Sequence, residues 1–273
     1  MDVLSPLSPI SQPSDDDINF FIAVLRDYDA WVYPFLPIIT TAEARDAIAT
    51  MHYDREARAF VYAVCAATIS LAHSLTAPEE EPAVILRWLE KSTDAAPGIL
   101  ALENITVRRT VLAELTSMAL VGLGQFEPAH HYLRQAISMV DAQRLGDANK
   151  LLEFPPAERA RRQRLYWLLF IHERYFALSH HHVISMAPME WMPEFDESIP
   201  AHITHGFNQI ISLFRHIDVD MIDAWLAVTD ETANVSAAWI QAKHRELEAE
   251  PAGNAEHIAV SLTRGLLADV LLT

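Results

Sequence analysis

Adjacent histidines are the first residues in this chain whose chemistry suggests a site. His180, His181 and His182 follow one another directly, and His130 and His131 form a second pair. Imidazole nitrogen is a common zinc ligand. Neighbouring side chains on a helix point about 100° apart, so three consecutive histidines cannot all reach one ion. We therefore expect no metal site here, and we expect the triplet to mark a solvated helix end, where imidazolium also suits the helix dipole.

The motifs of several enzyme classes are incomplete or missing. His172 and Glu173 do not begin a metalloprotease HExxH motif, because the second histidine position holds Phe176. The sequence contains no GxSxG nucleophile elbow, no Walker loop and no GxGxxG pattern. The single cysteine, Cys65, lies among alanines, which is typical of an inert buried thiol, and it excludes an internal disulfide. We expect no catalytic residues, no bound metal and no cofactor.

A pair of charges follows an unbroken apolar run and raises the question of a buried ionic site. Tyr166 to Ile171 are six apolar residues in succession, and Glu173 and Arg174 come just beyond them, after His172. A helix that is apolar on every side must be surrounded by protein. Charges at its end must then reach the surface or find partners. We expect an ion-pair network, with Glu173 bound to an arginine of a neighbouring helix. The predicted structural hub comprises Tyr166, Trp167, Leu168, Phe170 and Glu173.

The elements that position these residues are predicted to be helices. Only seven glycines occur among 273 residues, and alanine and leucine are abundant, which favours an all-α fold, a multi-helical orthogonal or antiparallel bundle. Prolines mark the breaks, as at Pro34 and Pro37. Residues 1–14 are expected to be disordered and 15–273 to form a single helical domain. Helices are expected from about residue 15 to near 32, between 54 and 75, through 84–88, over 107–118 and 129–140, from about 159 to 179, and over 207–250 with a break near TDET, residues 229–232. A last helix is expected around 258–270.

Two of these segments predict a helical hairpin. One apolar stripe comprises Val107, Val111, Leu115 and Met118, and another comprises Ala129, Tyr132, Leu133, Ala136, Ile137 and Val140. A short linker, GLGQFEP, joins them. Gly146 is expected to end the second helix in a left-handed conformation. The pair resembles one tetratricopeptide-type unit, and no 34-residue repeat continues it.

The charge of the chain argues against nucleic-acid binding, and its apolar runs are too short to cross a membrane. The formal net charge is −17, whereas phosphate binding needs a surplus of Lys and Arg. The one dense basic group, Arg159, Arg161, Arg162 and Arg164, is expected to form a salt-bridged or solvated helix start. No run approaches the roughly 20 apolar residues that cross a bilayer, and no secretory signal is recognisable, so we expect a soluble protein.

Several motifs together resemble the fungal-specific transcription factor domain, the middle homology region of fungal zinc binuclear cluster regulators. The segment most similar to the family signature, residues 161–186, reads RRQRLYWLLFIHERYFALSHHHVISM. It is flanked by similar segments in the family's order: WVYPFLPII, GQFEPAHHYLRQAISMVDAQRLGD, ISLFRHIDVDMIDAW and AWIQAKHRELEAE. The resemblance covers roughly residues 17–273. The family's cluster of six zinc-binding cysteines has no counterpart here. We therefore expect an isolated regulatory region, a short paralogue or a fragment.

The resemblance implies a noncatalytic regulatory domain in the nucleus, shuttling with the cytoplasm, that senses an effector or contacts another protein and thereby alters transcription. The implied effectors are sugars or aromatic acids, and the implied protein partner is a relative or a second copy. A pocket is expected between helices 163–178 and 207–228. Its predicted ligand-binding residues are His172, Arg174, Tyr175, His181, Arg215 and His216.

Two alternatives stay open at this stage. One is a helical metabolic enzyme that depends on a metal. The acidic DDDIN segment, residues 15–19, is similar to the first motif of class I terpene synthases, but no second magnesium motif follows it. The other is a paralogue without the zinc cluster that acts like a corepressor by pairing with full-length relatives.

Overall fold

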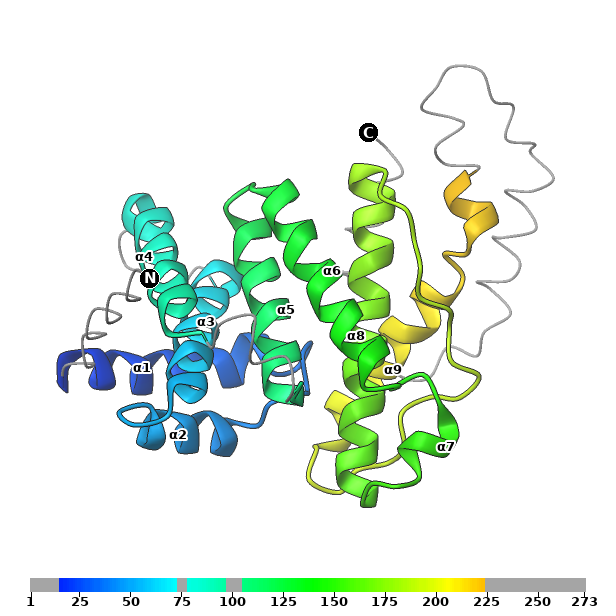
Figure 1. Cartoon of the computed structure of the whole chain (residues 1–273), viewed down its shortest axis with the longest axis horizontal. Coiled ribbons are helices and arrows are strands. Elements are labelled where there is room, and N and C mark those ends of the chain that lie inside the picture. Colours follow the sequence, from blue (N-terminus) through cyan, green and yellow to red (C-terminus); the bar gives the residue numbers. More distant parts are fainter. Residues whose placement is uncertain (1–14, 73–77, 97–104, 224–273) are drawn as a thin grey trace, which may run out of the picture. The chain divides into compact units, whose positions relative to one another are not determined.

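The computed structural model describes residues 15–72, 78–96 and 105–223. All regular secondary structure in these ranges is helical and no strand occurs in them, as the sequence predicts (Figure 1). The α-helices are α1 (Asp15–Asp27), α2 (Thr41–Thr50), α3 (Arg55–Ala72), α4 (Glu81–Ala95), α5 (Val107–Gly122), α6 (Phe126–Ala142), α7 (Ala148–Leu151), α8 (Pro156–His180) and α9 (Ala201–Arg215). A π-helix, η1 (Tyr28–Val32), continues α1, and a 3₁₀-helix, η2 (Pro78–Glu80), precedes α4.

The chain forms two compact units. Unit 1 contains the described residues up to Tyr33 and from Ile39 to Tyr132, and unit 2 contains Pro34–Ile38 and the described residues from Leu133 onward. Helix α6 therefore begins in unit 1 and ends in unit 2. The predicted disorder of residues 1–14 and the helix expected near 258–270 fall outside the described residues. No helix within the described ranges has the length and apolar character needed to span a bilayer.

Helix α3 is the centre of unit 1. It contacts α1, α2, α4 and α5, and α1 and α2 run crosswise to α4 and α5 (Figure 1). The sequence pattern predicts one buried face, whereas every residue from Ala57 to Ser70 is buried. The reason is the number of alanines, such as Ala63 and Ala66, whose small side chains let helices approach on all sides. Leu71, an apolar residue near the end of the helix expected over 54–75, is exposed.

The predicted helical hairpin is present as α5 and α6, an antiparallel pair. Gly124 adopts φ +69° in the turn, and the Ser117 hydroxyl on α5 donates to the Ala129 carbonyl on α6 at 2.8 Å. The left-handed conformation predicted for Gly146 is wrong. Arg144, with φ 55°, takes the left-handed position instead of Gly146. Gly146 instead leaves room for the Tyr166 ring, because a Cβ at this position would lie 3.1 Å from that ring.

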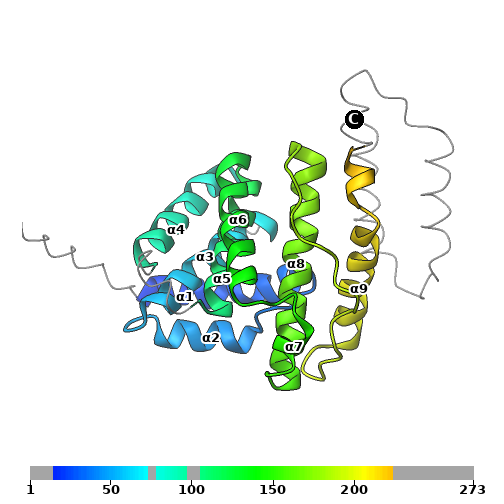
Figure 2. The ribbon, with the colours of Figure 1, turned by 45° about the vertical axis from the view of Figure 1, so that its right-hand side comes forward.

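Helix α8 is the long helix of unit 2, and α9 lies beside it (Figure 2). It begins at Pro156, earlier than the sequence suggests, because proline suits the first helical turn. It ends at His180, and His181 caps it in the left-handed region, with φ 58°. Helix α9 likewise begins before the predicted position, directly after Pro200, and a break at residues 216–218 interrupts the expected 207–250 helix.

Candidate binding site

The apolar run of α8 is buried on all sides, as predicted. The side chains from Tyr166 to Ile171 are all at most 8% exposed. The Trp167 indole nitrogen donates to the Trp191 carbonyl at 3.2 Å, and the Tyr166 hydroxyl donates to the Ala187 carbonyl at 2.8 Å. These bonds attach the irregular segment after α8 to the helix itself, because that segment folds back along it.

Glu173 and Arg174 form the ionic network that the sequence predicts. The Glu173 carboxylate accepts from Arg134 on α6 at 2.9 Å and from Arg174 at 2.9 Å. It also accepts the backbone N–H groups of Ser185 and Met186 at 2.8 and 2.9 Å. Arg174 donates to the Met186 carbonyl, and its guanidinium carbon lies 3.4 Å from the Phe170 ring centroid. Burial lowers the pKa of Arg174 to about 10. The pair therefore fastens residues 185–186 to α8.

The basic start of α8 is salt-bridged, as expected. Arg159 contacts Glu194 at 2.7 Å and Arg162 contacts Glu158 at 2.8 Å. The buried Arg164 binds Asp196 at 3.0 Å and also donates to the Pro37 carbonyl at 2.8 Å. Arg161 donates to the Ile38 carbonyl at 3.0 Å. The arginines thus satisfy carbonyls of the proline-broken segment, where helical N–H donors are missing.

The six residues predicted to bind a ligand lie on α8, at its cap and at the end of α9. Arg174 is committed to the Glu173 network, and His181 is the exposed helix cap. His172, Tyr175 and His216 are half-buried, and Arg215 is exposed. The guanidinium of Arg215 lies 5.9 Å from the Trp167 ring centroid. Ligand binding by these six residues stays a prediction.

An apolar cluster occupies the contact between the end of α8 and the residues after α9. It consists of Ala177, Leu178, Ile217 and Ile222, and Ile184, Phe214 and Met221 pack against it. The adjacency of these two segments was predicted, and apolar side chains of both pack together there. Among the described residues, no three His, Cys, Asp or Glu side chains are grouped so that they could hold a metal ion. His180 and His182 instead pack near the Phe176 ring, at 5.7 and 5.9 Å between centroids.

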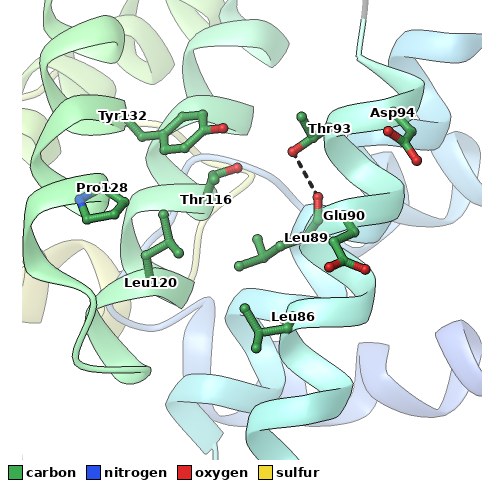
Figure 3. Close-up of a pocket in the computed structure, with 9 residues that line it drawn as sticks. All are labelled: Leu86, Leu89, Glu90, Thr93, Asp94, Thr116, Leu120, Pro128 and Tyr132. Carbon is green, nitrogen blue, oxygen red and sulfur yellow. Dashed lines mark hydrogen bonds between the residues drawn. The ribbon is translucent and has the colours of Figure 1, made fainter.

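A hollow of about 460 Å³ lies in unit 1 between α4, α5 and α6 (Figure 3). We call it the α4–α6 hollow. Helix α4 contributes the positions 86, 89, 90, 93 and 94, which recur at three- and four-residue steps and therefore share one face. The apolar part of this face consists of Leu86 and Leu89. A volume of this size lies within the range of small-molecule sites.

The opposite wall of the α4–α6 hollow comes from the helical hairpin. Thr116 and Leu120 belong to α5, and Pro128 and Tyr132 belong to α6. Leu120 is buried, and the Thr116 hydroxyl donates to the Leu112 carbonyl at 2.9 Å. The Tyr132 ring borders the hollow, and its hydroxyl points across toward α4 (Figure 3). The wall is thus mainly apolar, with one phenol facing the partner helix.

Two acidic residues of α4 are among those that line the hollow, and the Asp94 carboxylate points away from it (Figure 3). Glu90 and Asp94 are both exposed. Neither carboxylate has a hydrogen bond or an ion pair within the described part of the chain. Arg55 donates to the backbone carbonyl of Asp94 at 3.3 Å. Thr93 lies between them, and its hydroxyl donates to the Leu89 carbonyl at 2.9 Å.

Sequence reasoning missed this hollow. The available signal was the face of α4 on which acidic and apolar residues alternate at helical spacing. Its opposite wall could not be assigned without knowing which helices pack there.

Comparison with known proteins found no matching family model, curated protein or solved structure. The resemblance to the fungal transcription factor domain therefore stays a prediction that rests on sequence motifs.

Proposed function

We propose that the chain is a noncatalytic regulatory domain of the fungal transcription factor type, which binds an effector in the α4–α6 hollow and thereby modulates transcription. The observation that carries the proposal is the hollow itself, which offers a largely apolar space of about 460 Å³ between α4, α5 and α6. In this proposal the chain acts in the nucleus and does not itself contact DNA, because its formal net charge of −17 repels phosphate.

The contacts in unit 2 support the resemblance on which the proposal rests. The sequence motifs are far apart in the chain, yet they bond to one another. Arg161 and Arg164, at the basic start of α8, donate hydrogen bonds to the carbonyls of Ile38 and Pro37 in the segment WVYPFLPII. The Glu173 carboxylate accepts a hydrogen bond from the backbone N–H of Met186, which lies 13 residues further along the segment most similar to the family signature. These motifs therefore act together as parts of one packed structure.

Helix α6 connects the proposed effector site with α8, the helix that carries most of the signature-like segment. Tyr132 lines the hollow, and Arg134, two residues further along α6, binds Glu173 on α8. A ligand shifts a conformational equilibrium only if it binds one arrangement better than another. We propose that the ligand favours one position of α6 relative to α4, and that Arg134 transmits the difference to the Glu173 network.

A tethered reporter assay tests this proposal. The chain is fused to an unrelated DNA-binding module, and reporter expression is measured on media that differ in nitrogen and carbon source. Leu86→Trp fills the edge of the hollow, and Leu152→Trp, at an exposed position in unit 2, is the matched control. We expect medium-dependent expression from the wild-type and control fusions and a constant level from Leu86→Trp. A reporter that never responds, or a Leu86→Trp fusion that responds like wild type, contradicts the proposal.

A further inference from the structure

The α4–α6 hollow has a lining that narrows the class of its ligand. We infer that it takes a neutral molecule with an apolar body and one hydrogen-bonding group, such as an aromatic alcohol. This class differs from the sugars and aromatic acids that the family resemblance implies. The inference deepens the proposed function, on which it rests for the biological role of the site.

Apolar side chains from all three helices form most of the lining. Leu89 and Leu120 are 6% and 7% exposed, and they face one another across the space between α4 and α5 (Figure 3). Leu86 extends this surface along α4, and Pro128 and the Tyr132 ring extend it along α6. Apolar ligand surface that leaves water here favours binding in proportion to its area. The lining therefore selects an aromatic ring or a hydrocarbon body.

The two threonine hydroxyls of the lining already donate within their own helices. Thr93 donates to the Leu89 carbonyl at 2.9 Å, and Thr116 donates to the Leu112 carbonyl at 2.9 Å. A hydroxyl has a single proton to donate, so neither threonine has a donor left for a ligand. A sugar carries several hydroxyls, and each one that leaves water without a partner costs free energy. The lining therefore disfavours sugars.

The lining also disfavours a charged ligand. None of the nine residues that line the hollow, all within the described part of the chain, is basic, so a carboxylate would find no counter-charge among them. Arg55, which donates to the Asp94 carbonyl near the end of α4, is not one of the nine. An ammonium group gains little either, because Glu90 and Asp94 are exposed and ion pairs at exposed sites are weak. A charge that leaves water without a close partner opposes binding.

The Tyr132 hydroxyl is the polar group that can orient a neutral ligand. It points across the hollow toward α4 (Figure 3). It makes no hydrogen bond with any other residue that the structure describes. A phenol both donates and accepts, so it suits one hydroxyl or carbonyl oxygen of a ligand. This unused group is a second observation, separate from the apolar walls, and it sets the number of polar groups that the ligand needs.

Calorimetric titration of the full chain tests the ligand class with four probes. The probes are the neutral 2-phenylethanol, the anionic 3-phenylpropionate, the cationic 2-phenylethylamine and glucose. We expect 2-phenylethanol to bind at least about tenfold more tightly than the acid and glucose, because their polar groups find no partners in the lining. We also expect it to bind more tightly than the amine. A smaller preference over the acid or glucose, an amine that binds as tightly as the alcohol, or no binding of the alcohol overturns the inference.

Two conservative tyrosine variants locate the binding. Tyr132→Phe removes only the phenol oxygen from the hollow, and Tyr53→Phe, at a position that is 78% exposed, is the matched control. We expect Tyr132→Phe to lower the affinity for 2-phenylethanol by about fivefold, as for the loss of one hydrogen bond. The affinity for ethylbenzene, which has the ring without the hydroxyl, should not change. No loss for the alcohol, an equal loss for ethylbenzene, or an equal loss in Tyr53→Phe contradicts the inference.

The outcomes separate the ligand class from the proposed function. If the Leu86→Trp fusion loses its response in the reporter assay while 2-phenylethanol does not bind, the ligand class is wrong and the regulatory function stands. If 2-phenylethanol binds and needs the Tyr132 hydroxyl, but Leu86→Trp leaves the reporter response unchanged, the ligand class is correct and the function is wrong.

Discussion

At the scale of single residues, Glu173 carries the most interactions in the signature segment. Its carboxylate is 2% exposed and neutralises Arg174 and Arg134 while it fixes the backbone of residues 185 and 186. The need for a partner was predictable, because a charge follows six apolar residues. The identity of the partner was not, since Arg134 lies 39 residues away and nothing in its local sequence distinguishes it from other arginines.

Replacing Glu173 by glutamine tests the network. Glu173→Gln keeps the shape of the side chain but leaves the buried guanidinium of Arg174 without its counter-charge. We expect the free energy of unfolding to fall by about 3 kcal/mol, as for other buried pairs that lose one partner. Urea denaturation measures the change, and Glu190→Gln, an exposed control, should alter stability by less than about 0.5 kcal/mol. A loss no larger than in the control would show that the pair is dispensable.

Asp196 predicts an acid-sensitive contribution to stability. Burial opposes its ionisation, but hydrogen bonds from Ser198 and Arg164 outweigh burial and lower the pKa of its carboxyl. A folded pKa below the unfolded one stabilises the protein at higher pH, and the gain is lost as pH falls below about 4. Wild type should therefore exceed Asp196→Asn in stability near neutral pH, and the gap should narrow in acid. Urea denaturation across this pH range checks it, and a gap that widens in acid contradicts it.

At the scale of elements, the positions of helices were largely predictable and their ends were not. Apolar periodicity identified α5 and α6, because a buried face imposes a helical spacing on the sequence, and an unbroken apolar run identified the buried part of α8. The ends depend on backbone conformations that single residues adopt only in context. Arg144 and His181 take left-handed positions, while Gly146 is small because the Tyr166 ring approaches it.

Replacing a histidine by glycine is expected to change the free energy of unfolding in opposite directions at the cap of α8 and inside α9. His181→Gly should raise the free energy of unfolding by about 1 kcal/mol, because glycine adopts the left-handed conformation at no steric cost. His205→Gly, inside α9, should lower it by about 0.5 kcal/mol, because glycine is a poor helix former. Thermal denaturation of both variants decides. Destabilisation by His181→Gly would show that the imidazole, rather than the backbone conformation, is what this position needs.

At the scale of the whole molecule, the all-helical class followed from composition, but the candidate site did not follow from the sequence. The pocket expected beside α8 stays a prediction, and an apolar cluster of Ala177, Leu178, Ile217 and Ile222 lies where α8 meets the residues after α9. The hollow arises where three helices from separate parts of the chain meet, and Leu89 faces Leu120 only in the folded protein. Such a site depends on packing, which periodicity alone does not specify.

Because the chain forms two compact units, we expect a destabilising substitution in one unit to leave the stability of the other unchanged. Each unit has its own buried core, with α3 in unit 1 and α8 in unit 2. We expect Glu173→Gln to increase amide hydrogen exchange in α8 and to leave exchange in α3 as in wild type, because opening of one cooperative unit need not open another. Mass spectrometry after deuterium labelling measures both helices. An equal increase in α3 would indicate that the chain unfolds as one unit.

The most direct test of the proposed site is to map where a small apolar molecule binds. Titration of 2-phenylethanol into isotope-labelled protein, followed by amide chemical shifts in nuclear magnetic resonance spectra, reports on every helix at once. The account predicts that the shifts concentrate on residues 86–94, 116–120 and 128–132. Shifts confined to His172, Tyr175, Arg215 and His216, or no shifts at all, would contradict it.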